Sequence, residues 1–212
     1  MGLEVIPIIA LMGVVFFSSQ GPEKKPLTPT SSFLDNKYML GLEVETPSIN
    51  EDLDTKTIYK YITTSYKKIP TSDAKSISQY LVEYGKQHQV DPKFTAALIS
   101  RESGFNRQAI SSAGAKGLGQ IKEMNYPSLN ITDPYDIKEN VSGTTAYVKQ
   151  MLKNWKDKTA KVSLALASYY KGFTGVKNTP GLLDEDSTRY VKGILDSYQK
   201  ILDVQKKIET EK

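Results

Sequence analysis

The stretch FTAALISRESGFNRQAISSAGAKGLGQ, from Phe94 to Gln120, joins an apolar pattern to a loop of small residues. Two residues just before it, Asp91 and Pro92, are typical of a helix start. An aspartate side chain accepts hydrogen bonds from the first free N–H groups of a helix, and proline has no N–H to lose at the first helical position. The sequence therefore predicts a helix that begins at Pro92.

One carboxylate lies at the far end of this predicted helix. Phe94, Leu98 and Glu102 recur at intervals of four residues, so they share one helix face. Gly104 follows two residues later and is expected to end the helix in the left-handed backbone conformation, which places Glu102 in the last turn. The apolar face of the helix therefore ends in a carboxylate.

Two interpretations of Glu102 are open on spacing alone. The free carbonyl groups of the helix end and partial burial would both raise the pKa of the carboxyl group, as a general acid near neutral pH requires. Alternatively, Glu102 is a solvated residue at a helix end, paired with Arg101 or Arg107. Periodicity does not decide between the two.

Composition limits the kinds of site that the chain can hold. It has 212 residues, of which 39% are hydrophobic, enough for the core of one globular domain with appendages. It contains no cysteine and one histidine, which excludes disulfides, cysteine zinc sites and histidine-rich metal sites. The net charge is +4, and the basic residues are spread along the chain. This mild excess of positive charge would suit a protein that binds an anionic surface, whereas nucleic-acid-binding proteins usually carry dense clusters of basic residues. We expect no metal and no direct contact with nucleic acid.

The N-terminal residues 1–19 form a segment that resembles a signal peptide or an anchor. Val5–Phe17 is a run of 13 apolar or neutral residues, shorter than the roughly 17 to 25 that span a bilayer as a helix. Glu4 precedes the run, and the site for cleavage after it is poor, so an uncleaved anchor competes with a signal peptide. Lys24 and Lys25 follow on the side that the positive-inside tendency would keep in the cytoplasm. We expect Val5–Phe17 to contact a membrane and leave its orientation open.

The rest of the chain divides by composition and periodicity into a linker and helical parts. The expected parts are a linker rich in Pro, Ser and Thr over residues 20–50, a helical connector over 51–72, a main domain over 73–205 and a charged tail over 206–212.

Helical periodicity dominates the main domain, and no convincing strand occurs in it. Helices are expected over residues 53–69, from a cap at 71–73 to about 85–88, and over 137–155, 162–170 and 187–208. The segment GAKGLG matches a phosphate-binding loop only superficially, because no strand precedes it and no Gly-Lys-Ser/Thr follows. The expected fold class is mainly α.

Four sequence patterns occur in a fixed order: ESGFNRQAISSAGAKGLGQ, DPYDIKENVSGTTAYV, ALASYYKGFTGV and STRYVKGIL. Together, over about Ile77 to Ile201, they resemble the catalytic domain of the soluble lytic transglycosylases (SLT), a lysozyme-like helical fold related to the goose-type lysozymes. Four ordered patterns are much more specific than any one of them. The resemblance implies a lysozyme-like catalytic domain within residues 73–205, after the apolar segment and the linker.

The resemblance also implies roles for single residues. Glu102 matches the catalytic acid/base of the family, and its neighbour Ser103 matches a residue that helps to orient the site. Asn140 and Gly143 match packing positions that support the groove. The positions that we expect at the substrate are Ser103, the groove residues Gly117, Leu118 and Gln120, and the tyrosines Tyr169, Tyr170 and Tyr190.

Three departures from the family pattern concern the groove. Gly119 stands where the family usually has methionine, so an apolar contact to the sugar would be missing. Tyr170 stands where the family usually has asparagine, and the segment TRYV is one residue shorter than usual. None of these departures involves Glu102.

The activity that the resemblance implies is cleavage of peptidoglycan glycan strands between N-acetylmuramic acid and N-acetylglucosamine without water and without a cofactor. Two alternatives stay open. A hydrolytic muramidase would use a second carboxylate, for which Glu123, Asp133 and Asp136 are available. A non-catalytic module would only bind glycan or act as a scaffold.

The setting that we expect is the periplasmic side of a bacterial cell envelope, with or without membrane anchoring. The alternative is a virion component that is delivered to the envelope, within a particle or an envelope-spanning complex. The weak N-terminal signal favours this second setting slightly.

Overall fold

The computed structural model describes residues 44–45, 47–178 and 183–211. Its helices are α1 (Glu51–Ser65), α2 (Thr71–His88), α3 (Pro92–Glu102), the short 3-10 helix η1 (Glu123–Asn125), α4 (Tyr126–Leu129), α5 (Ile137–Asn154), α6 (Lys161–Lys171), α7 (Phe173–Lys177) and α8 (Glu185–Thr210). β pairing in the described residues is limited to three isolated bridges. The predicted mainly α fold class is therefore confirmed for this part of the chain.

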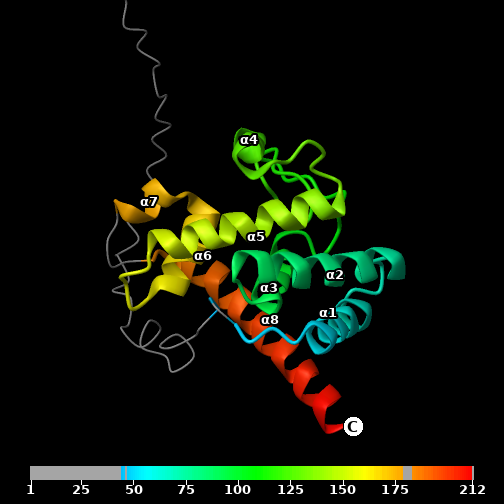
Figure 1. Cartoon of the computed structure of the whole chain (residues 1–212). Helices are drawn as coiled ribbons and strands as arrows, with labels where there is room; N and C mark the ends of the chain where they lie inside the picture. The colour runs from blue at the N-terminus through cyan, green and yellow to red at the C-terminus, as the bar shows by residue number, and fades with distance from the viewer. Residues whose placement is uncertain (1–43, 46, 179–182, 212) are drawn as a thin grey trace, which may run out of the picture.

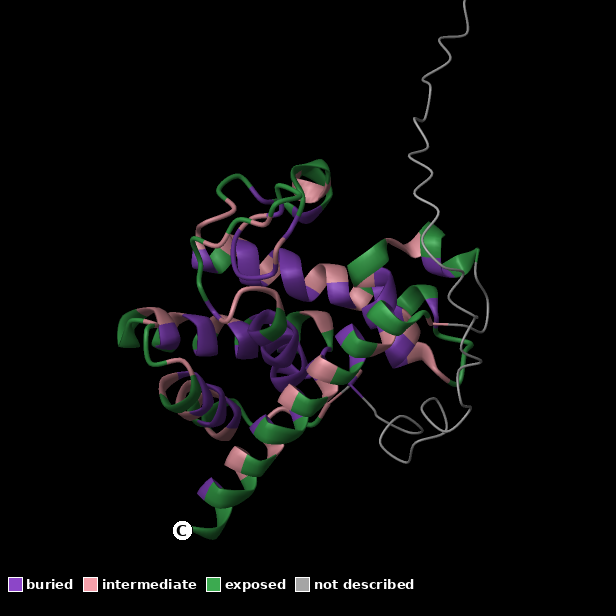
Figure 2. Ribbon diagram, turned by 180° about the vertical axis from the view of Figure 1, so that it is seen from behind, coloured by how far each residue is buried: buried purple, intermediate pink, exposed green. Residues whose placement is uncertain are grey.

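Helix α3 lies at the centre of the domain. It packs against α8, α2, α1 and α5, and every residue from Pro92 to Ser100 is buried. The sequence predicts one apolar face for this helix, whereas the structure buries all of its faces, because neighbouring helices surround it (Figure 1). Figure 2 shows exposed residues on the outer surfaces of the surrounding helices. Only the two ends of α3 can therefore present polar groups to other parts of the fold.

The start of α3 follows the predicted capping pattern. The Asp91 side chain accepts a hydrogen bond from the Lys93 N–H at 2.8 Å, and Pro92 is the first helical residue. At the other end, Gly104 has a φ of +56°, the left-handed conformation that favours glycine. Both predicted boundaries of the helix are confirmed.

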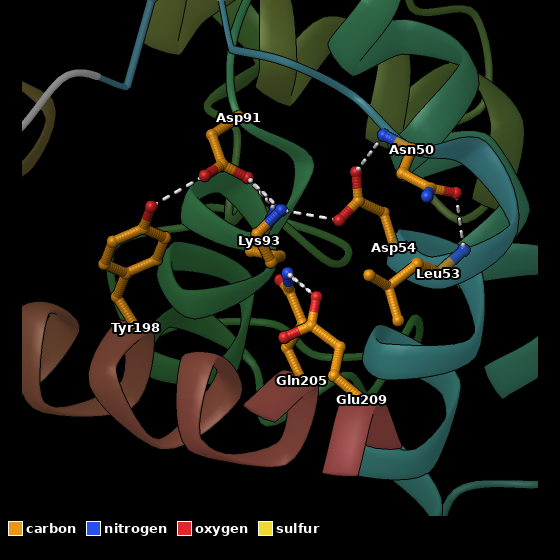
Figure 3. A network of polar contacts seen from close by, with 8 residues as sticks. All are labelled: Asn50, Leu53, Asp54, Asp91, Lys93, Tyr198, Gln205 and Glu209. Carbon is orange, nitrogen blue, oxygen red and sulfur yellow. Dashed lines mark hydrogen bonds and ion pairs between the residues drawn. The ribbon is translucent and has the colours of Figure 1, made fainter. Parts of the chain in front are cut away.

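A buried charged cluster surrounds the start of α3 (Figure 3). The Lys93 Nζ lies 2.6 Å from Asp54 Oδ1 of α1 and 3.3 Å from Asp91 Oδ1. The Tyr198 hydroxyl of α8 donates to Asp91 Oδ2 at 2.6 Å. The Asn50 N–H donates to the other oxygen of Asp54 at 3.1 Å, so both carboxylates have several partners. The cluster joins α1, α3 and α8 through buried ionic and polar contacts.

Helix α1 corresponds to the predicted connector and packs closely on the domain. It contacts α2 and α8, and its Ile58 and Ile62 are fully buried in the main core. It ends at Ser65, four residues before the predicted end at Ile69, because Tyr66 leaves the helical conformation. Tyr66 then packs edge-to-face on Phe105, with ring centroids 5.0 Å apart.

The last residues of the predicted linker also contact the domain. Val44 is fully buried, and its carbonyl oxygen accepts a hydrogen bond from the Asp91 N–H at 2.7 Å. Glu45 lies 2.9 Å from Lys149 Nζ on α5 and 3.0 Å from Lys161 Nζ on α6. The chain is thus fastened to the domain before α1 begins.

Several expected boundaries differ from the observed ones. Helices α4 and α7 were not predicted, because each is only about one turn long and too short for a periodic signal. The N-cap of α2 is Pro70, which makes no side-chain cap, and residues 71–73 form the first helical turn.

Within the described ranges, no helix is both long and apolar enough to cross a bilayer. The predicted apolar segment Val5–Phe17 lies outside the described residues.

Candidate active site

Glu102 is the last residue of α3, at the end opposite the charged cluster. Burial raises the pKa of its carboxyl group from 4.5 to about 7, although a hydrogen bond from Tyr190 and the charge of Arg101 act in the lowering direction. Among the described residues, Glu102 forms no ion pair with Arg101 or Arg107; Arg107 instead lies 3.5 Å from Asp73. The interpretation of Glu102 as a solvated, ion-paired residue is therefore wrong.

Tyr190, on the first turns of α8, contacts the Glu102 carboxyl group directly. Its hydroxyl donates a hydrogen bond to Glu102 Oε1. The Arg101 guanidinium lies 5.9 Å from the centroid of the Tyr190 ring. Burial and the neighbouring Glu102 raise the pKa of Tyr190 well above its usual value, so its hydroxyl stays a donor at neutral pH.

Tyr169, on α6, contacts the loop that follows α3. Its hydroxyl donates to the carbonyl oxygen of Gly119 at 2.7 Å. Burial, followed by the charge of Glu102, raises the pKa of Tyr169 well above its usual value, which shows that the two side chains are close enough to interact electrostatically. Three segments that are far apart in sequence therefore meet at Glu102.

The loop between Glu102 and Ile121 is held by its own hydrogen bonds. Lys116 forms isolated bridges with both Ile110 and Ile121. The Gln120 Nε2 donates to the carbonyl oxygens of Ala109 at 3.1 Å and Gly117 at 2.9 Å. The side-chain nitrogen of Gln120 thus holds the loop closed. The side-chain oxygen of Gln120 is the atom of this amide that is not used in these two hydrogen bonds.

The loop is attached to α5 through Asn140. The Asn140 Oδ1 accepts from the Gly119 N–H at 2.8 Å, and its Nδ2 donates to the Pro134 carbonyl at 2.8 Å. A Cβ atom on Gly117 would lie 2.1 Å from Pro134 O and 2.2 Å from Asn140 Nδ2, so glycine is required there. Leu118 is fully buried in the main core and supports the loop from behind.

The backbone at Gly119 is also closely packed. A Cβ atom there would lie 1.9 Å from the Oγ1 of Thr144, which is fully buried on α5. The Gly119 N–H and C=O bind Asn140 and Tyr169 respectively. At this position the methionine of the family pattern would therefore collide with Thr144.

Two further predicted residues lie near the site without contacting the carboxyl group. The Ser103 hydroxyl donates back to the Ile99 carbonyl at 3.3 Å, so it is engaged with α3. A Cβ atom on Gly143 would lie 2.6 Å from Ile131 Cδ1, which makes Gly143 a packing position between α5 and the segment that follows α4.

Tyr170 is the residue of the site that faces solvent. It is 49% exposed, and its ring stacks on that of Tyr190 at a centroid distance of 4.7 Å and an interplanar angle of 16°. The stacking was not predicted, because no sequence signal pairs residues on two different helices.

The three acidic residues that the sequence offers as a second catalytic carboxylate have other contacts. Asp136 caps α5 by accepting from the Glu139 N–H at 2.8 Å, and Asp133 accepts from the Tyr135 N–H at 2.9 Å. The Glu123 side chain is 80% exposed and lies 3.9 Å from Lys116. The described part of the chain also contains no cluster of three or more side chains suited to a metal.

Comparison with known proteins identifies the domain. A family model described as the transglycosylase SLT domain matches residues 79–191, more than half of the chain. The transglycosylase of Enterobacteria phage PRD1 is 33% identical over 86 residues, which are 41% of this chain and 31% of that protein. The membrane-bound lytic murein transglycosylase F of Desulfosudis oleivorans is 30% identical over 95 residues, or 43% of this chain and 21% of that protein. The chain thus spans a third or less of the matched relatives.

A solved structure supports the fold independently. An inactive mutant of the lytic transglycosylase Slt from Pseudomonas aeruginosa superposes with a TM-score of 0.51 at 19% identity, covering 76% of this chain and 31% of that chain. The structural match covers a larger share of this chain than the family model does.

Proposed function

Because the chain belongs to the transglycosylase SLT domain family, we propose that it cleaves the β-1,4 bond between N-acetylmuramic acid and N-acetylglucosamine in peptidoglycan, with Glu102 as its single acid and base. The observation that carries this proposal is the Glu102 carboxyl group, partly buried and with a pKa raised to about 7. A carboxyl group with this pKa is protonated in a useful fraction near neutral pH and still accepts a proton readily afterwards. The same proposal includes the lysozyme-like fold, related to that of the goose-type lysozymes, which the sequence resemblance implies.

The reaction needs two proton transfers through the same carboxyl group. Glu102 first donates its proton to the glycosidic oxygen, and the bond from that oxygen to C1 of the muramic acid breaks. The resulting carboxylate then takes the proton of the 6-hydroxyl of the same sugar, and O6 bonds to C1. The products are a 1,6-anhydro end and a free 4-hydroxyl, no water is consumed, and Glu102 is protonated again.

Tyr190 and Tyr169 support this cycle in different ways. The Tyr190 hydroxyl donates to Glu102 Oε1 and so stabilises the carboxylate that forms after the first transfer. Tyr169 holds the Gly119 carbonyl and thereby fixes the loop against α6. One carboxylate suffices in this scheme because the nucleophile belongs to the substrate, whereas glycosidases usually need a second one.

Mass spectrometry of digested peptidoglycan tests the proposal. We expect anhydro-muramyl ends from the native chain, and a loss of roughly 10²- to 10⁴-fold in their rate of formation for Glu102→Gln, with folding and glycan binding retained. Ends that carry one added water would identify a hydrolytic muramidase instead. Glycan binding without any cleavage by the native chain would identify a non-catalytic module.

The cellular setting is a separate proposal. We place the domain at the periplasmic face of a bacterial envelope, with Val5–Phe17 in contact with the membrane. The matched relatives include a phage protein and membrane-bound bacterial proteins, so delivery by a virion is the alternative. Fractionation of host cells against purified particles, with the intact mass of the N-terminus, separates the two; recovery in the cytoplasm alone would contradict both.

A further inference from the structure

An aromatic ring is exposed next to Tyr190, the residue that binds the candidate acid. Among the described residues, the large apolar side chains that are exposed are Ile110, Met124 and Tyr170, and Tyr170 is the aromatic one. Half of its surface is accessible, at 49%. Single exposed apolar side chains are common, so the case for a ligand depends on the contacts of this ring.

The contacts of Tyr170 show which part of its ring is accessible. One face stacks on Tyr190 at 4.7 Å and 16°, which is nearly parallel. The accessible area therefore belongs to the opposite face and the edges. Since the Tyr190 hydroxyl contacts Glu102 Oε1, a single side chain, that of Tyr190, connects Tyr170 to the acid.

The residues on both sides of Tyr170 are held in place. Lys171, the next residue, forms an ion pair with Asp184, and Asp184 caps α8 by accepting from the Ser187 N–H at 2.8 Å. Tyr169, the preceding residue, is bound to the Gly119 carbonyl. The end of α6, which carries Tyr170, is thus tied both to the start of α8 and to the loop, and the stack on Tyr190 restrains the ring itself.

We propose that the open face of Tyr170 is a stacking platform for the sugar ring that adjoins the cleaved bond. A β-linked pyranose carries its axial C–H groups on a flat, weakly positive face, which complements the negative face of an aromatic ring. This inference rests on the proposed function, since it concerns the glycan that Glu102 would cleave.

A purely structural role for Tyr170 makes a different forecast. If Tyr170 served only to hold Tyr190 against Glu102, its loss would disturb the hydrogen bond to the carboxyl group and shift the pH dependence of cleavage. A platform that contacts the sugar instead changes KM and binding while the pH dependence stays in place. The two roles therefore separate in a comparison of affinity with pH profile.

The binding experiment uses the Glu102→Gln chain, in which turnover is strongly reduced, and the tetramer of N-acetylglucosamine as the probe. Adding Tyr170→Phe, which keeps the ring, should change Kd by less than about twofold. Adding Tyr170→Ala or Tyr170→Asn should weaken binding by about 10-fold, the loss expected for one aromatic stacking contact. Tyr59→Ala is the control, because it removes a tyrosine from the groove between α1 and α2, which neither α6 nor α8 lines.

The activity experiment uses the chain with native Glu102 and purified glycan strands. Tyr170→Ala should raise KM by about the same factor, with the alkaline limb of the pH profile unmoved and the folded state intact by circular dichroism. An unchanged KM, or a moved limb, would overturn the platform. Anhydro products with unchanged KM would refute the platform alone, whereas hydrated products with a raised KM would refute the proposed reaction alone.

Discussion

Helices α3 and α8 bring a carboxyl group and a tyrosine hydroxyl together at both ends of α3, and the two ends differ in charge. At the start, Asp91 accepts from Tyr198, and Lys93 lies between Asp91 and Asp54. At the end, Glu102 accepts from Tyr190, and the described residues supply no ion pair. At the start of α3, the buried carboxylates are paired with the ammonium group of Lys93 and form a structural cluster. At the end, the buried carboxyl group of Glu102 is bound by the neutral hydroxyl of Tyr190, and its pKa is about 7.

The largest effect should follow when the cation is removed from the structural end. Lys93→Met leaves Asp54 and Asp91 buried without their counter-ion, so we expect a loss of about 3–5 kcal/mol in the free energy of unfolding, measured with urea. Lys86→Met is the control, because the Lys86–Glu51 pair is exposed and should contribute less than about 1 kcal/mol. Equal losses for both variants would mean that burial does not distinguish the two ion pairs.

The next effect concerns the pH dependence of stability at the catalytic end. The pKa of Glu102 is about 7 in the folded chain, above the ordinary value of 4.5, so between these values the unfolded chain releases a proton that the folded chain keeps. Folding stability is therefore lost as the pH rises through this window, by an amount on the order of 3 kcal/mol. Glu102→Gln should lack this loss.

The measurement compares the two chains directly. Unfolding free energies of native and Glu102→Gln chains should be similar below about pH 4.5, diverge in favour of the variant up to about pH 7, and then stay parallel. All other titrating groups are shared, so they cancel in the difference. A constant difference across this range would show that the carboxyl group titrates normally.

The smallest effect compares the two tyrosines. Tyr190→Phe removes a hydrogen bond that lowers the pKa of Glu102, so this pKa should rise further, and the alkaline limb of the activity profile should move up by about half a unit to one unit. Tyr198→Phe is the matched control: it should destabilise the fold by roughly 1–3 kcal/mol and leave the profile in place. A shift of the profile toward lower pH in Tyr190→Phe would contradict the assigned role of the hydroxyl.

The sequence predicted the two boundaries of α3 much better than the contacts that its two ends make. Asp91, Pro92 and Gly104 have local conformational roles, so the helix boundaries followed from the pattern alone. The convergence of Tyr169 and Tyr190 on Glu102 required the family resemblance, because contacts between α3, α6 and α8 leave no periodic signal.

The structural cluster could not be found from the sequence. A lysine in the first turn of a helix usually lies at the surface, and the partner Asp54 belongs to the predicted connector, outside the predicted main domain. Burial of Lys93 becomes evident only when α1 is seen against α3 and α8. The stacking of Tyr170 on Tyr190 escaped prediction for the same reason.

The contact between Gly119 and Thr144 restricts the order in which this groove can change over generations. A side chain at position 119 first requires that position 144 lose the atoms that now occupy the same space, at 1.9 Å from the added Cβ. A lineage with glycine at 119 therefore cannot acquire the family methionine in a single step without strain. Substitution of Gly119 therefore depends on prior substitution of Thr144, and Gly119 is favoured for as long as Thr144 is present.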